Sequence, residues 1–395
     1  MSDNIPLEIQ VEIIKRLPVQ SLMQFRSVSK TWKSFIDSSH FIAHYSPQPQ
    51  HLLVTYEDPV DHKQKYVSIA DYDNQKLFLT IPLLVNMLMC CSIIGFSHGL
   101  FCLYGIFPKG NGGPISRIHM AVIWNLSIRK AVPVVVPNVA FGMYETVIGF
   151  GVCGATSDPK IVKVTYIKRR SRLEGIPWQV EVFTLSTRVW RSSYGSNLSC
   201  KSIQFDSLQV ALDGFLYWIA DDMIAMDSGF RSYNLIISFD ITSEQFSQVN
   251  LPDTLAHHRS HYNLSLSKLR ESLGVLERGV EANNVVFSVW MMEHGVLKSF
   301  TKLYTFNVSA LDASVRGFRN SGELLIEISE EDDLGSYKLV VYDPYSKCID
   351  TLGIDRINCS YYVYPYMETL LLLDQPNLTV YNEMETIKFV DDLVS

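Results

Sequence analysis

Residues 5–22 read IPLEIQVEIIKRLPVQSL, and this stretch decides the fold of the first part of the chain. Its apolar residues recur at every fourth position, which places them along one face of an α-helix. These residues are Ile5, Ile9, Ile13 and Leu17. Prolines stand where helices begin, at Pro6 and Pro18, because the N–H that proline lacks has no partner in the first turn. The spacing therefore predicts one helix up to Leu17 and a second helix that begins at Pro18.

Residues 25–32 read FRSVSKTW and continue this pattern. Leu22 and Phe25 are expected to point inward in the second helix. A third helical segment over residues 29–37 carries the apolar residues Trp32, Phe35 and Ile36 at helical spacing. The apolar faces of such a small unit exceed what its short helices can cover alone. We therefore expect this unit to bind a partner surface.

These two stretches resemble the F-box of plant F-box proteins, over residues 3–44. The resemblance implies a helical domain at 1–46 that docks on a Skp-type adaptor, which bridges to a cullin and its RING partner. Ile5 departs from the usual leucine of the family, a swap that conserves volume. The expected adaptor-binding residues are the positions that match the motif: Ile5, Pro6, Ile9, Ile13, Leu17, Pro18, Leu22, Val28 and Trp32. The sequence does not separate those that face the adaptor from those that close the helix bundle.

A linker with two prolines over 46–50 precedes a different kind of sequence, in which short apolar runs alternate with turns. This pattern is typical of an all-β domain. A loose repeat joins an apolar pair, a polar turn and a step into an aromatic residue. Its turns fall at positions 71, 125, 184, 240, 291, 343 and 382, a mean spacing of about 52 residues. This period predicts a β-propeller of about six to eight blades over residues 51–395.

Three phrases of this region are similar to the plant F-box-associated interaction domain of the F-box/kelch-like proteins. They are GFSHGL at 95–100, GFG at 149–151 and LDGFLYW at 212–218. The fold class is thus a small all-α F-box module followed by a large all-β domain. The resemblance implies a non-catalytic substrate-recognition subunit of an SCF-type ubiquitin ligase, whose β domain binds a target protein for ubiquitination and proteasomal degradation.

Two alternatives to this function stay open. One is an F-box scaffold that binds the adaptor without promoting degradation. The other is a small-molecule-binding or catalytic propeller with an incidental helical unit. Neither the target protein, nor the face that binds it, nor its pathway is indicated by the sequence.

Composition excludes several classes of protein. A net charge of −7 offers no basic field for nucleic acid. Seven cysteines without a C-x-x-C pair indicate neither a disulfide framework nor a zinc site, and no secretory signal is visible at the start. We therefore expect an intracellular protein of the cytoplasm or nucleus. The uncharged stretch 77–108 is interrupted by polar and turn residues, so we expect buried strands there and no membrane span.

Four further motifs suggest chemistry and have simpler interpretations. The G-x-G-x-x-G of residues 149–154 precedes a second strand-like run and no helix, so we expect a glycine-rich hairpin and no nucleotide site. The cluster His257, His258 and His261 lies in a polar stretch without a convincing fourth metal ligand. Asp221 and Asp222 are expected on a solvated loop. The strand tryptophans Trp124, Trp178, Trp190, Trp218 and Trp290 are expected in the core. We thus predict no catalytic residues, metal or cofactor.

Overall fold

The computed structural model describes residues 6–45, 50–58, 61, 63–70, 75–109, 116–140, 142–167, 178–193, 203–226, 229–257, 263–281, 284–293, 298–308, 312–329, 336–357 and 361–375. By its internal contacts the chain forms two compact units. The first unit contains Met1–Leu52, Ala70–Asn138 and Tyr366–Ser395. The second unit contains Leu53–Ile69 and Val139–Pro365.

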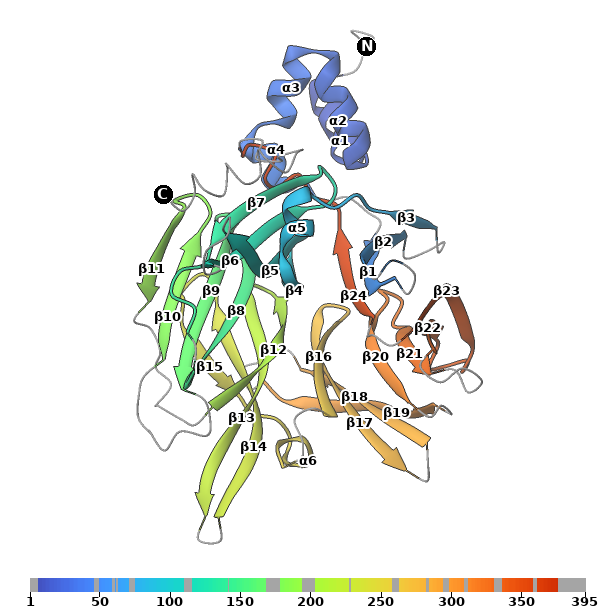
Figure 1. The fold of residues 1–395 in the computed structure, drawn as a ribbon. Helices are drawn as coiled ribbons and strands as arrows, with labels where there is room; N and C mark the ends of the chain where they lie inside the picture. Colours follow the sequence, from blue (N-terminus) through green and yellow to red (C-terminus); the bar gives the residue numbers. More distant parts are fainter. Residues whose placement is uncertain are drawn as a thin grey trace. The chain divides into compact units, whose positions relative to one another are not determined.

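Four short helices open the chain, shown in blue in Figure 1. They are α1 (Leu7–Lys15), α2 (Val19–Val28), α3 (Lys30–Ile36) and α4 (Ser39–His44). The first three confirm the helices that the sequence predicts, and α4 is an addition. It begins because the Ser38 Oγ accepts a hydrogen bond from the Phe41 N–H at 3.3 Å. Two further helices are short: α5 (Leu83–Met87) and α6 (Asp253–Ala256).

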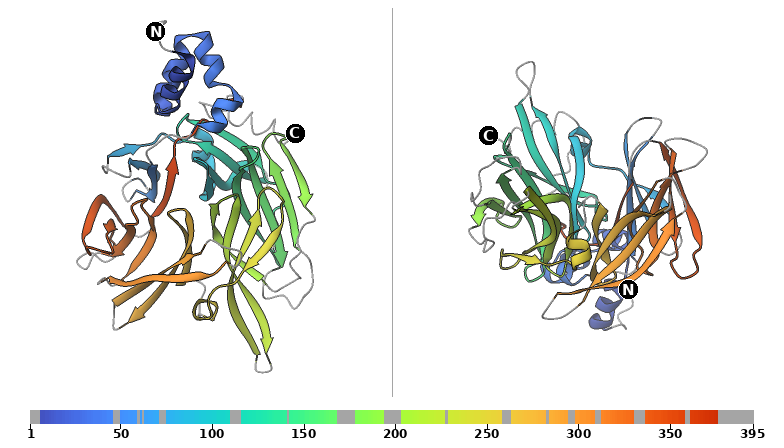
Figure 2. Two further views of the ribbon diagram at one scale, coloured as in Figure 1. Left: turned by 180° about the vertical axis from the view of Figure 1, so that it is seen from behind. Right: turned by 90° about the horizontal axis from the view of Figure 1, so that it is seen from below.

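The rest of the described chain is built of strands, which form six four-stranded sheets. One sheet joins the last strand to the first three in the order β24-β1-β2-β3: Tyr362–Met367, Gln50–Glu57, Gln64–Ala70 and Lys76–Phe78. The next contains β4 to β7: Met89–Ser97, Leu100–Lys109, Ser116–Asn125 and Lys130–Val135. The sheet of β8 to β11 contains Tyr144–Cys153, Asp158–Ile167, Gln179–Thr184 and Val189–Ser193. Figure 2 shows the strands from behind and from below.

The three remaining sheets also follow the chain. The sheet of β12 to β15 contains Ile203–Leu212, Phe215–Met226, Gly229–Asp240 and Phe246–Val249. The sheet of β16 to β19 contains Leu264–Leu269, Ser272–Glu281, Asn284–Met292 and Phe300–Val308. The last, β20 to β23, contains Ala313–Phe318, Leu324–Ser329, Ser336–Tyr342 and Ile349–Ile357. Sequential antiparallel sheets of four strands are the blade unit of a β-propeller, as the repeat predicts.

The third strand of several blades ends in the same turn. Arg188, Glu244 and Lys347 each donate a backbone hydrogen bond to the carbonyl four residues earlier, at 2.9, 2.8 and 2.8 Å. All three adopt a left-handed conformation, with φ between 55° and 59°. The Asp240 side chain supports its turn by accepting from the Thr242 N–H at 2.7 Å. The Asp343 side chain does the same for the Tyr345 N–H at 2.9 Å, so the polar turn of the sequence repeat has a structural role.

The uncharged stretch 77–108 folds into β3, α5 and the two strands β4 and β5. Leu100 to Leu103 of β5 are fully buried, which confirms the prediction of buried strands for this part. Leu77 and Phe78 of β3 are exposed, so the prediction is wrong there. Among the described residues, no helix has the length and apolar character needed to cross a bilayer.

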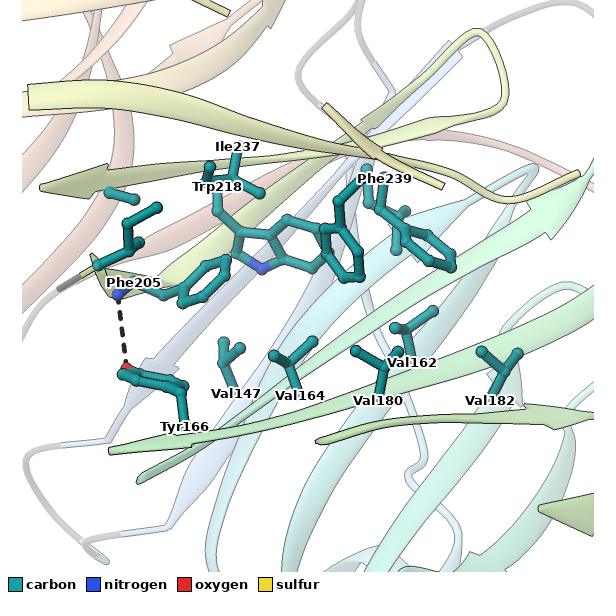
Figure 3. Packing of buried hydrophobic residues seen from close by; sticks show 14 of the residues in the cluster. Val147, Val162, Val164, Tyr166, Val180, Val182, Phe205, Trp218, Ile237 and Phe239 are labelled. Atoms are coloured by element: carbon teal, nitrogen blue, oxygen red, sulfur yellow. Dashed lines mark hydrogen bonds between the residues drawn. The ribbon is translucent and has the colours of Figure 1, made fainter. Parts of the chain in front are cut away.

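Side chains of the β8–β11 and β12–β15 sheets form one apolar cluster (Figure 3). Trp218 is a fully buried member of this cluster, and Trp178 packs against the cluster. The Tyr166 hydroxyl accepts a hydrogen bond from the Phe205 N–H at 3.4 Å, which joins the two sheets. The core prediction is confirmed for Trp124 and Trp218, which are buried, while Trp178 and Trp290 are half-buried and pack against core clusters. Trp190 is half-buried beside Phe183 and the Lys163 ammonium.

Gly149 and Gly151 of the G-x-G-x-x-G motif lie in β8, and Gly154 lies in the turn that leads directly to the paired strand β9 and not to a helix. This confirms the hairpin and leaves the motif without the helix that a dinucleotide site requires. A Cβ on Gly149 would lie 2.4 Å from the Trp218 Cζ2, and a Cβ on Gly151 would lie 2.3 Å from the Ile241 Cδ1. These positions are therefore glycine because the next sheet packs directly on the backbone.

We predict that Gly149→Ala lowers the free energy of unfolding by about 1–3 kcal/mol, because the indole of Trp218 has no room to move. Gly154→Ala is the matched control, since no heavy atom lies within 4 Å of its added Cβ. Urea unfolding of both variants measures the difference. Equal stability of the two variants would contradict this packing argument.

Candidate interaction surface

Each helix of the amino-terminal module starts for a local reason. Pro6 and Pro18 precede α1 and α2 with φ of −54° and −58°, the values that proline fixes. Ser29 caps α3 through its Oγ, which accepts a hydrogen bond from the Trp32 N–H at 3.1 Å. The module therefore begins three helices at the positions that the sequence pattern marks.

The helices share one apolar interior. It contains Ile14, Val19, Leu22, Ile36, Phe41, Ile42 and Tyr45. Two leucines that follow β24, Leu370 and Leu373, belong to the same cluster. Part of the apolar surface of the helices is thus covered by the chain itself.

A charged group holds α2 against the end of α3. Arg26 donates from Nε and Nη2 to the two Asp37 carboxylate oxygens at 2.5 and 2.9 Å, and Lys33 donates to the same carboxylate at 2.6 Å. Burial alone would raise the pKa of Asp37, but the hydrogen bonds from Arg26 and Lys33 outweigh it, so the pKa lies below the ordinary 3.8. The folded module therefore favours the ionised form of Asp37.

Because the pKa of Asp37 is lower in the folded state, its contribution to stability is complete above pH 3.8 and is lost as the pH falls through the folded value. We predict that Asp37→Asn raises amide hydrogen exchange in α2 and α3 at pH 7, consistent with a loss of about 1.5–3 kcal/mol. The difference from the natural protein should shrink as the pH is lowered below 3.8. A difference independent of pH would contradict this role of the carboxylate.

The module leaves apolar side chains in solvent on α1 and α2. Ile9 and Ile13, one turn apart on α1, are 52% and 50% exposed. Val28 at the end of α2 is 68% exposed. Half-exposed isoleucines one turn apart are a feature that a protein partner can cover, with a gain of up to about 1–2 kcal/mol for each side chain. We call Ile9, Ile13 and Val28 the exposed apolar face.

The structure separates the predicted adaptor-binding residues into three groups. Ile9, Ile13, Val28, Pro6 and Pro18 are exposed. Leu17 and Trp32 are half-buried and pack against the apolar interior. Leu22 is fully buried, and Ile5 lies outside the described residues. Leu22→Asp would therefore disrupt the module, and the exposed isoleucines are the better positions for a docking test.

The prediction for Asp221 and Asp222 is wrong. Both residues lie within β13, and they are 1% and 9% exposed. Asp221 accepts a hydrogen bond from the Ser232 Oγ at 2.8 Å. The β13–β14 hairpin is longer than the other hairpins of its sheet, so residues expected on a loop stand inside a strand.

The histidine cluster lies mostly outside the described residues. His257 ends α6 with its ring 5.2 Å from the ring of Tyr233, and His258 and His261 are not described. In the part of the chain that the structure describes, no three histidine, cysteine or acidic side chains gather as metal ligands would.

The fold defines a class: a small helical module followed in the chain by a six-bladed β-propeller. Residues 2–44 match the F-box domain model, and residues 115–355 match the model of the F-box associated beta propeller domain. The chain belongs to the F-box associated beta propeller family.

Relatives that this chain matches over most of their length are described as F-box proteins. An F-box/kelch-repeat protein of Arabidopsis thaliana is 23% identical over 351 residues, which cover 85% of this chain and 87% of the relative. The F-box protein CPR1 of Arabidopsis thaliana is 24% identical over 392 residues, which cover 93% of this chain and 89% of the relative.

Proposed function

We propose that this chain is the substrate-recognition subunit of an SCF-type ubiquitin ligase. Its F-box module binds a Skp-type adaptor, which bridges to a cullin and its RING partner. Its propeller holds a target protein for ubiquitination and proteasomal degradation, in the cytoplasm or nucleus. The chain performs no bond chemistry itself in this role.

The observation that carries the proposal is the exposed apolar face on a module whose interior is already complete. Leu22 and Ile14 are buried, so the module does not need Ile9 and Ile13 for its own core. Ile9 and Ile13 are half-exposed in the folded chain, and binding of a partner protein that covers them accounts for this exposure. The match of residues 2–44 to the F-box supports a Skp-type adaptor as that protein.

Tethering then explains how a subunit without catalytic groups promotes a reaction. A target held by the propeller stays near the ubiquitin-conjugating enzyme at an effective concentration in the millimolar range for a short connection. The gain comes from proximity, so it requires both the adaptor-binding face and the target-binding face on one chain.

Proximity labelling tests this proposal. The natural chain and the Ile13→Asp variant are each fused to a biotin ligase and expressed in plant cells with and without a proteasome inhibitor. With the natural chain, we expect a labelled target that accumulates when the proteasome is inhibited. With Ile13→Asp, the same target should be equally abundant with and without the inhibitor. Absence of a Skp-type adaptor among the labelled proteins would refute docking. A labelled partner whose abundance ignores the inhibitor with the natural chain would refute degradation and support a scaffold.

A further inference from the structure

The segment that follows β24 lies against the four helices at the start of the chain, as Figure 1 shows in red beside α4. Leu370 is fully buried, and Leu373 is 8% exposed. Both pack in the cluster that contains Ile14, Val19 and Leu22. Residues separated by almost the whole chain therefore share one apolar interior.

The same segment supplies the missing cap of α2. Pro18 precedes this helix and offers no side-chain acceptor, so the first N–H groups need partners from elsewhere. The Glu368 Oε2 accepts a hydrogen bond from the Val19 N–H at 2.9 Å across 349 residues of sequence. A carboxylate at this position also interacts favourably with the positive end of the helix dipole.

Tyr45 is a second residue of the helical module that lies near Glu368. The Tyr45 hydroxyl donates to the Leu17 carbonyl at 2.6 Å. Burial raises the pKa of Tyr45, and the nearby negative charge of Glu368 raises it further. Glu368 therefore lies close to two parts of the module, the start of α2 and the residue that follows α4.

The opposite side of the segment is bonded to the β4–β7 sheet. The Asn125 Nδ2 donates to the carbonyls of Thr369 and Leu371 at 3.0 and 2.7 Å. The Lys130 Nζ donates to the Leu373 carbonyl at 2.9 Å. Four acceptors of one short segment thus bind either the helices or the two residues that flank the β6–β7 turn: the Glu368 carboxylate and the carbonyls of Thr369, Leu371 and Leu373.

The approach of this segment to the sheet is close. A Cβ on Gly99 would lie 2.3 Å from the Met367 carbonyl oxygen, so only glycine fits at that point of the β4–β5 turn. Gly99 also has φ of 77°, which glycine adopts without strain. Both features fix the path of the chain from the end of β24 into the helical module.

We propose that residues 368–373 are a structural part of the F-box module, which they complete and lock to the β6–β7 turn. The module is then a rigid extension of the β4–β7 sheet, although only a short linker joins it to the strands in sequence. The consequence for ligase geometry rests on the proposed function: the orientation of the bound adaptor relative to this sheet is set by the 368–373 segment.

Amide hydrogen exchange of the full-length protein, without any adaptor, tests the proposal. We expect Leu370→Ala to raise exchange in α1, α2 and α4 by about tenfold or more, because it leaves a cavity in their shared interior. Glu368→Gln, a milder change, should raise exchange mainly at Val19 and the next residues of α2. Leu273→Ala is the matched control, since Leu273 is equally buried in β17 and lies outside this cluster.

Exchange in the four helices that is the same in Leu370→Ala, Glu368→Gln and the natural protein would overturn the proposal. Exchange that rises equally in Leu273→Ala would also overturn it, because the effect would then be global. A Skp-type adaptor is added in a second step, where Leu370→Ala should weaken binding although Leu370 is not on the exposed apolar face. Failure of the natural protein to bind the adaptor would refute the proposed function, and the exchange data would still decide the role of the segment.

Discussion

Replacement of Glu244 by glutamine is expected to lower the free energy of unfolding by about 3–5 kcal/mol. Glu244 is 6% exposed and pairs with Lys160 at 2.9 Å, and the Arg191 guanidinium binds the same oxygen. The Lys160 Nζ also donates to the Ile241 carbonyl at 2.8 Å, which holds it in the interior between two sheets. Glutamine therefore leaves the Lys160 ammonium buried without its counter-charge, and this penalty is the cause of the loss.

Urea unfolding at pH 7 measures this effect, with Glu271→Gln as the control. Glu271 pairs with Lys268 at 3.1 Å, but its side chain is 78% exposed. Water screens that pair, so the control should change stability by less than about 1 kcal/mol. Similar losses of stability in the two variants would contradict the claim that burial of the Lys160 ammonium causes the effect of Glu244→Gln.

The second large effect is expected at the exposed apolar face. The double variant Ile9→Asp, Ile13→Asp should weaken binding of the full-length protein to a Skp-type adaptor by about 100-fold or more. Both residues are half in solvent, so the free protein tolerates the carboxylates. A bound adaptor would have to bury them unpaired, which is costly. Titration calorimetry with purified adaptor measures the change.

Val189→Asp and Val280→Asp are the controls for this experiment. These valines lie on the strands β11 and β17 and are 57% and 66% exposed, so they match the isoleucines in chemistry and exposure. Their adaptor affinity should equal that of the natural protein. A double variant that keeps its thermal stability and binds the adaptor normally would contradict the assignment of the face.

The blade turns were predictable because their chemistry is local. Positions 125, 184, 240 and 343 all fall where the third strand of a sheet ends. Asn125, Asp240 and Asp343 accept backbone hydrogen bonds from residues two positions later, so the polar residue and the turn occur together. Position 291 lies at the end of β18, position 71 follows β2 directly, and position 382 lies outside the described residues.

Which side chains are buried could not be predicted as well as the turns. The four-residue spacing of Ile9 and Ile13 defines a helix face but not whether that face is covered, and the structure leaves it in water. Asp221 and Asp222 follow an apolar run and continue the same strand, and nothing in their local sequence indicates burial. The part played by Glu368 and Leu370 depends on a contact across most of the chain, which no local pattern contains.

Covalent side-chain footprinting of the full-length protein, with and without a saturating Skp-type adaptor, tests the central claim most directly. The claim predicts that Ile9, Ile13 and Val28 lose most of their labelling in the complex, while Val189 and Val280 keep theirs. Unchanged labelling of Ile9 and Ile13 in a complex that has formed, or a folded protein that forms no complex at all, would contradict it.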